Sequence, residues 1–100
     1  MIRWMRKTRI SRGKYIPAIA WSTEITEYVK KVKELSSIEV FIDLFGEGGT
    51  VRWIVDYEDL ATLEKAQAQV RDDPEYWRKL EQAEGLFIDG STYDVVMRKI

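Results

Sequence analysis

Charged side chains recur at every fourth position along two predicted neighbouring strands, and on the shared face they alternate with apolar residues. Asp43 and Glu39 share one face of the strand over residues 38–45, and Arg52 and Asp56 share one face of residues 50–57. Carboxylates beside guanidinium groups can bind a polar or anionic small molecule, or act as an acid–base pair. The last strand adds two more residues by the same alternation. We therefore predict a ligand-binding set of Arg52, Asp43, Glu39, Asp56, Asp94 and Arg98, and we assign no catalytic residue.

The same residues also have a structural explanation, namely an ion-paired dimer interface with trapped water. A four-residue loop over residues 46–49 would set Asp43 opposite Arg52, which is a match of opposite charges. It would also set Glu39 opposite Asp56, a like-charge match that costs energy unless a cation joins it. The sequence leaves the binding site and the interface open as alternatives.

Composition excludes several kinds of chemistry. The chain of 100 residues has no cysteine, which removes disulfides, thiolate catalysis and the common structural zinc sites. It has no histidine, which removes the usual general base, the Ser-His-Asp triad and a histidine-held haem or metal. We expect no metal and no cofactor. Any enzyme built from this chain must use Asp, Glu, Tyr, Lys or Arg.

Charge and hydropathy bound the partners and the compartment. A net charge of −1 gives no general reason to bind nucleic acid, and residues 50–57 lack the aromatic pattern of RNA-binding sheets. The longest apolar run, from Tyr15 to Trp21, is too short to span a bilayer and contains Pro17. We therefore expect a cytoplasmic protein with neither nucleic acid nor membrane as a partner.

Periodicity predicts the elements that carry these residues. Alternation over residues 2–10 predicts a strand with Ile2, Trp4, Thr8 and Ile10 on one face. Apolar residues spaced by three and four predict a helix over residues 17–35, and residues 38–45 and 50–57 read as a hairpin. Two further helices follow, one capped by Asp59 and one capped by Asp73 with Pro74 at its first position. Residues 91–100 end the chain as a strand.

The predicted order is β-α-β-β-α-β, the ferredoxin-like α+β fold with a four-stranded antiparallel sheet, in one domain over residues 1–100. One sheet face is apolar and packs under the helices. The strands contribute the following residues to it: Ile38, Val40, Ile42 and Leu44; Val51, Trp53, Val55 and Tyr57; and Tyr93, Val95 and Met97. We expect all the tryptophans, Trp4, Trp21, Trp53 and Trp77, to be core residues.

The opposite sheet face is half apolar and half charged, so neither water nor a dry core suits it. Its apolar members are Met5, Phe41, Phe45, Ile54 and Val96. A patch of this kind is large for a monomer to expose. We expect a homodimer in which two sheets stack face to face around a cavity with polar walls.

The chain resembles the dimeric α+β-barrel superfamily, and within it NIPSNAP-like bacterial proteins of unassigned role. The resemblance rests on element order and on the segments Phe45–Trp53, Asp73–Tyr76, Leu86–Phe87 and Gly90–Asp94. It implies a dimeric barrel. Because the superfamily includes cofactor-free monooxygenases, haem enzymes and ligand-binding proteins, the resemblance alone assigns no activity. The haem branch's histidine ligand has no match here, and no monooxygenase residue set is matched.

The sequence thus predicts a small dimer that binds a small polar or anionic ligand in the cavity between the sheets. The alternative is a cofactor-independent monooxygenase acting on an aromatic substrate. The shape of the cavity distinguishes them: a wide apolar pocket with an Arg or Tyr reaching in favours oxygenation, whereas a narrow space filled by ion pairs favours a structural dimer.

Overall fold

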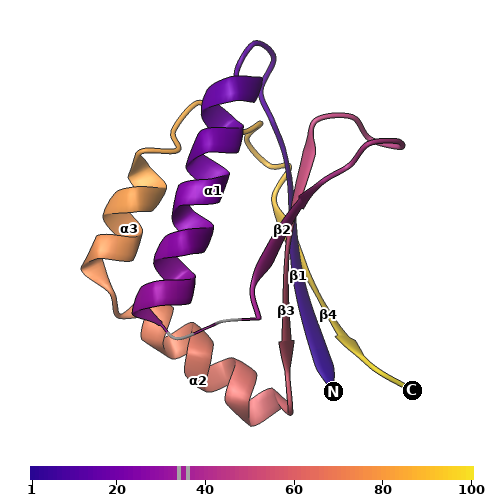
Figure 1. Ribbon diagram of the computed structural model, residues 1–100, viewed down its shortest axis with the longest axis vertical. Helices are drawn as coiled ribbons and strands as arrows, with labels where there is room; N and C mark the ends of the chain where they lie inside the picture. Colours follow the sequence, from indigo (N-terminus) through magenta and orange to yellow (C-terminus); the bar gives the residue numbers. More distant parts are fainter. Residues whose placement is uncertain (34, 36) are drawn as a thin grey trace.

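The computed structural model, which describes residues 1–33, 35 and 37–100, has two layers, a sheet and a layer of helices on one of its faces (Figure 1). The four-stranded sheet has the order β2-β3-β1-β4, and all neighbours are antiparallel. This confirms the predicted ferredoxin-like α+β fold. The elements are β1 (Ile2–Arg9), α1 (Tyr15–Val32), β2 (Glu39–Ile42), β3 (Thr50–Tyr57), α2 (Leu60–Arg71), α3 (Pro74–Glu81) and β4 (Tyr93–Arg98).

The two predicted helix caps are present. Asp59 accepts a hydrogen bond from the Thr62 backbone N–H, 2.8 Å, and Asp73 accepts one from the Glu75 N–H, 3.0 Å. Pro74 occupies the first turn of α3, where its missing N–H costs nothing. These caps divide the second helical segment into α2 and α3. No helix in the described part of the chain is both long and apolar enough to cross a bilayer.

The core lies between α1 and the sheet. All the predicted helix-facing residues of β3 are buried, and they pack with Ile25 and Val29 of α1. The Trp53 indole donates to the Thr26 hydroxyl, 3.0 Å, so its buried N–H has a partner. One α1 residue of the predicted stripe, Val32, is half exposed instead, because it is the last residue of the helix.

The predicted β2–β3 register is wrong. Glu39 lies opposite Ile54, and Phe41 lies opposite Arg52, two residues away from the expected pairing. The Asp43 N–H donates to the Thr50 carbonyl, 3.0 Å, so the loop spans residues 44–49 rather than 46–49. Leu44 and Phe45 therefore lie in the loop, and they are exposed instead of continuing the strand. The predicted like-charge pair of Glu39 and Asp56 does not form.

The predicted faces of β4 are exchanged. Register with β1 sets Asp94 opposite Arg6, Val96 opposite Trp4 and Arg98 opposite Ile2, on the side that faces the helices. The other β4 residues, Tyr93, Val95 and Met97, belong to the open sheet face. Both β4 faces contain apolar residues, so alternation alone does not orient this strand. Its orientation follows from the polar partners that β1 offers.

Candidate functional site

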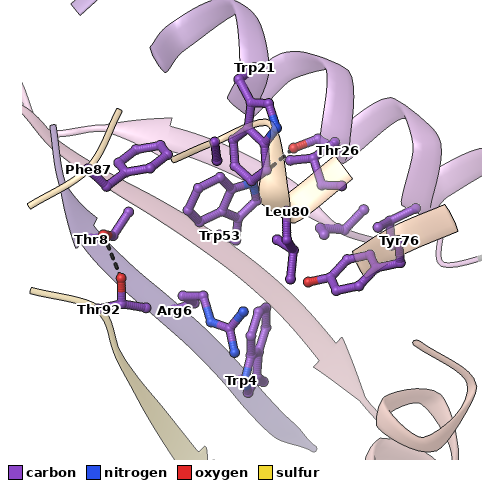
Figure 2. Close-up of a pocket in the computed structure, with 14 residues that line it drawn as sticks. Trp4, Arg6, Thr8, Trp21, Thr26, Trp53, Tyr76, Leu80, Phe87 and Thr92 are labelled. Atoms are coloured by element: carbon purple, nitrogen blue, oxygen red, sulfur yellow. Dashed lines mark hydrogen bonds between the residues drawn. The ribbon is translucent and has the colours of Figure 1, made fainter. Parts of the chain in front are cut away.

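A pocket lies on the helix side of the sheet, between β1 and β3 below and α1 and α3 above (Figure 2). Its volume is about 160 Å³. A second cavity of about 540 Å³ adjoins it towards α2 and shares several lining residues. The lining residues labelled in Figure 2 are Trp4, Arg6, Thr8, Trp21, Thr26, Trp53, Tyr76, Leu80, Phe87 and Thr92.

Three aromatic rings form the inner wall of the pocket. Trp21 of α1, Trp53 of β3 and Phe87 meet edge to face, with ring centroids 5.7 to 6.4 Å apart. Edge-to-face contacts of this kind fix the rings relative to one another. The wall is consequently a rigid apolar surface on which a flat molecule can rest.

Arg6 brings a positive charge to this otherwise apolar space. Its Nε and Nη2 donate to the two carboxylate oxygens of Asp94, 2.8 and 3.0 Å, and its guanidinium lies 5.4 Å from the Trp4 ring centre. The Trp4 indole also donates to Asp94, 3.3 Å. Each side chain of the ion pair is about one third exposed. Within the described residues Arg6 Nη1 makes no well-formed hydrogen bond, and the nearest polar group to the guanidinium besides Asp94 is the Tyr76 hydroxyl, whose weak interaction adds to the raised pKa of Arg6.

The ion pair keeps its charges. Burial raises the pKa of Asp94, but the hydrogen bonds and charge of Arg6 outweigh burial, so that this pKa lies below its ordinary value. The hydrogen bond from Arg6 to Asp94 is also the main cause of the raised pKa of Arg6. The pair has no net charge, and it presents a guanidinium N–H to the pocket.

Tyr76 of α3 directs its hydroxyl into the pocket, on the side of Leu80 and Arg6 (Figure 2). Burial raises the pKa of this hydroxyl, while the nearby Arg6 charge opposes that rise. The phenol therefore stays protonated near neutral pH and can donate a hydrogen bond. Arg6 and Tyr76 together offer two donors beside an aromatic wall.

Four of the other predicted site residues, Arg52, Asp43, Asp56 and Glu39, lie on the open sheet face, away from the pocket. Arg52 donates from Nε and Nη2 to Asp43, 2.8 and 3.0 Å, which confirms this predicted ion pair although it is diagonal rather than directly opposite. Asp56 pairs with Arg3, 2.8 Å, while Glu39 is exposed. Arg98 lies on the helix side at the end of β4 and is exposed. Of the predicted set, only Asp94 lies at these cavities, where it lines the second one and pairs with Arg6, which lines both.

Several pocket residues were not predicted as functional. The sequence analysis gives Arg6 no role and predicts Trp4 and Trp21 only as core residues. The available signal was Arg6 itself, since a charged residue between Trp4 and Thr8 interrupts an otherwise uncharged strand face. Tyr76 gave no such signal, because its position depends on how α3 packs. Within the described part of the chain, acidic side chains form no cluster suited to a metal ion.

Comparisons with known proteins identify the fold. No family model matches the chain, and no curated protein matches it. Among solved structures, a NIPSNAP family protein from Agrobacterium tumefaciens is 16% identical, with a TM-score of 0.80, over 99% of this chain and 92% of that one. A NIPSNAP domain protein from Burkholderia xenovorans is 14% identical, with a TM-score of 0.74, over 100% and 95%.

A third similar structure is an antibiotic biosynthesis monooxygenase, 15% identical, with a TM-score of 0.74, over 100% of this chain and 99% of that one. At these identities the comparisons support the fold and not the activity. The predicted likeness to NIPSNAP-like proteins is confirmed at the level of the fold. The chain has the ferredoxin-like fold that NIPSNAP family proteins share with an antibiotic biosynthesis monooxygenase.

Proposed function

We propose that the pocket beneath α1 and α3 binds a small organic ligand that has a flat apolar body and one polar or anionic group. The apolar body would rest on Trp21 and Trp53, and the polar group would accept hydrogen bonds from Arg6 Nη1 and the Tyr76 hydroxyl. The observation that carries this proposal is Arg6. Its guanidinium lines a mostly apolar pocket, and Asp94 occupies only two of its three nitrogens.

The neutral Arg6–Asp94 pair limits what such a ligand can be. A ligand bearing several negative charges would meet Asp94 without a compensating excess of cations. One acceptor group, such as a carboxylate, a sulfonate or a carbonyl, matches the two donors. This ligand class agrees with the sequence-based prediction, but the site lies within one protomer and not between two sheets.

Binding can be tested with 1-anilinonaphthalene-8-sulfonate, which has flat rings and one sulfonate. We expect saturable binding that Arg6→Lys weakens about tenfold, which corresponds to about 1.4 kcal/mol, because lysine retains the charge but loses the guanidinium donors. Tyr76→Phe should also weaken binding, because it removes only the hydroxyl donor.

The chain offers a matched control for this experiment. Arg3 lies on the same strand and makes the same two-bond contact with an aspartate, Asp56, but it faces the open side of the sheet. Arg3→Lys should leave dye binding unchanged. Equal effects of Arg3→Lys and Arg6→Lys would rule out the pocket as the binding site.

A second candidate function, cofactor-independent oxygenation of an aromatic substrate, is favoured by the aromatic pocket walls with Arg6 and Tyr76 reaching in. Such chemistry needs a base to remove a substrate proton. The resulting carbanion passes one electron to dioxygen, the two radicals combine and take back the proton to give a hydroperoxide, and loss of water leaves the oxygenated product. The candidate base is Asp94, the carboxylate beside these donors, although its two hydrogen bonds from Arg6 weaken it as a base. Oxygen uptake with polyhydroxylated naphthalenes, abolished by Asp94→Asn, would support this function. An uptake rate no higher than without protein would exclude it for these substrates.

The open sheet face is proposed as the contact between two copies of the chain. It exposes Phe41, Tyr93 and Met97, each with 39% or more of its surface accessible. Three ion pairs lie among these apolar residues, formed by Arg52 with Asp43, by Arg3 with Asp56 and by Lys7 with Glu47. Stacking two such faces would bury the apolar side chains while the charged ones keep their partners.

A further inference from the structure

Helix α3 is attached to α1 by polar contacts. Its N-terminal end is held by Asp73, whose carboxylate accepts from the Tyr28 hydroxyl, 2.6 Å, and lies 3.0 Å from Lys33 Nζ. Asp73 also caps α3 and joins it to α2 through a short connection. Several interactions and the chain itself therefore converge at this end of the helix.

The other end of α3 has a lighter attachment. The Trp21 indole N–H donates to the Lys79 backbone carbonyl, 2.9 Å, in the last turn of the helix. Lys79 Nζ also lies 3.3 Å from Glu24, which is mostly exposed, and 5.1 Å from the centre of the Tyr28 ring. Ion pairs with an exposed partner contribute little to stability. Within the described residues, the bond from Trp21 is the hydrogen bond that joins α1 to the backbone in the last turn of α3.

The apolar side of α3 borders the cavities and does not complete the core. Tyr76 and Leu80 line both cavities, and no residue of α3 is fully buried. Elements with few buried apolar contacts open at a lower free energy than the core. Beyond α3 the chain passes through Gly85, at φ +80°, and is then fixed to the end of β1 by the hydrogen bond from the Ile88 N–H to the Arg9 carbonyl, 2.8 Å.

We propose that α3 is a hinged cover of the pocket, which pivots at Asp73 and is latched by the Trp21–Lys79 hydrogen bond. The inference rests on the proposed function, since it describes how a ligand enters that site. Trp21 belongs both to the latch and to the aromatic wall. A ligand that rests on Trp21 therefore contacts the group that holds the cover closed.

Opening of α3 can be measured without any ligand from the reactivity of a single introduced thiol, because the chain contains no cysteine of its own. Val29→Cys puts one thiol on α1 in the wall of both cavities, at a position 5% exposed. Val51→Cys puts a thiol at an equally apolar position, 1% exposed, that lines neither cavity. Both thiols are then reacted with 5,5′-dithiobis(2-nitrobenzoate) under native conditions and in low concentrations of urea.

We expect the Val29→Cys thiol to react at least about tenfold faster than the Val51→Cys thiol, and nearly independently of urea, as local opening requires. The Val51→Cys thiol should react only through global unfolding, at a rate that rises steeply with urea. Adding Trp21→Phe removes the latch hydrogen bond and retains an aromatic ring. It should accelerate the thiol reaction of Val29→Cys several-fold more than that of Val51→Cys.

Tyr28→Phe is the matched variant, because it removes one α1–α3 hydrogen bond at the pivot end. It should accelerate the Val29→Cys reaction less than Trp21→Phe does. Equal urea dependence of the two thiols, or equal acceleration of both by Trp21→Phe, would overturn the hinged cover. These rates involve no dye, so a failed dye-binding experiment would count against the proposed function alone.

Discussion

Two arginines of β1 make the same contact with different consequences. Arg3 and Arg6 each donate twice to an aspartate, at 2.8 and 3.0 Å. Arg3 lies on the open face and Arg6 in the pocket, because they are three positions apart and successive residues of a strand face opposite sides. Residue type therefore suggests chemistry, but strand register decides where that chemistry is available.

The Arg52–Asp43 pair was predictable because oppositely charged residues recur on neighbouring strands. It forms despite the wrong register, since long side chains also reach diagonal neighbours. The predicted partner of Asp56 was wrong. Its partner is Arg3, which lies directly opposite Asp56 on β1, the other neighbour of β3 in the sheet. An ion pair between long side chains can thus be predicted correctly even when the register is wrong, but it cannot be predicted when the wrong neighbouring strand is considered.

A double-mutant cycle tests whether Arg52 is structural. Arg52→Met alone leaves the Asp43 carboxylate unpaired and 14% exposed, and should cost about 1–3 kcal/mol of unfolding free energy, between values for exposed and buried pairs. The double variant Arg52→Met, Asp43→Leu should be close to the wild type. Urea unfolding measures all four corners of the cycle. Additive effects of the two substitutions would show that the pair contributes no coupling.

Trp53 was predicted to be buried on the helix side of β3, and the structure confirms this at 7% exposed. Trp53→Ala should cost about 3–5 kcal/mol, because it leaves a cavity and removes an edge-to-face partner of Trp21 and Phe87. Thermal unfolding measures the loss. The neighbouring substitution Ile54→Ala, on the open face, should cost clearly less, and a larger cost there would reverse the assignment of the faces.

At the scale of elements, local signals were reliable where they act within one turn. Asp59, Asp73 and Pro74 mark helix starts through contacts with residues two or three positions away, and all three predictions held. The facing of β4 was wrong because it depends on partners remote in sequence. The β2–β3 register was wrong because the alternating pattern continues through Leu44 and Phe45 and so does not show where strand pairing ends. β4 in particular is oriented by Arg6, which lies at the other end of the chain.

The Asp73 cap predicts a pH dependence. The hydrogen bond from Tyr28, with support from Lys33, lowers the pKa of Asp73 from 3.8 to about 2. As pH falls, the Asp73 carboxylate takes up a proton in the unfolded chain before it does so in the folded protein. The contribution of its charge to stability is therefore complete above about pH 4 and is lost as pH falls through 2. The stability difference between the wild type and Asp73→Asn should therefore shrink between pH 4 and pH 2.

Urea unfolding at a series of pH values measures this difference. The titration of the other aspartates cancels, because both proteins contain them. Asparagine also caps helices well, so the comparison isolates the charge from the cap. A stability difference that stays constant from pH 5 to pH 2 would mean that Asp73 titrates normally in the folded protein.

At the scale of the whole molecule, the sequence predicted one functional surface and the structure presents two. The open face was foreseen from its mixture of apolar and charged residues. The pocket was not, because it depends on the space that α3 leaves above β1, and no periodicity encodes such a space. The tryptophans illustrate this: Trp4, Trp21 and Trp53 belong to the core or pack against it as predicted, and they also line the pocket. The same prediction was wrong for Trp77, which is 49% exposed on α3.

Dimerisation through the open face is the prediction at this scale. Phe41→Asp puts a charge into the proposed contact at a residue 48% exposed, and should lower the mass measured by light scattering at micromolar concentration from dimer to monomer. Leu44→Asp is the control, since Leu44 is more exposed but lies in the β2–β3 loop. A wild-type protein that is already monomeric would exclude this dimer.

The position of β1 in the sheet has a consequence for the order of folding. β1 precedes every other described element along the chain, yet its two neighbours are β3 and β4, and β4 comes last. Pairings between remote segments must overcome the entropy of closing a long loop, which slows folding relative to helical proteins of the same size. During synthesis the edge of β1 that pairs with β4 therefore stays open until residues 93–98 have been made, long after β3 is available for the other edge. Arg3, Arg6, Lys7 and Arg9 keep that waiting strand charged, and charge disfavours pairing between nascent copies.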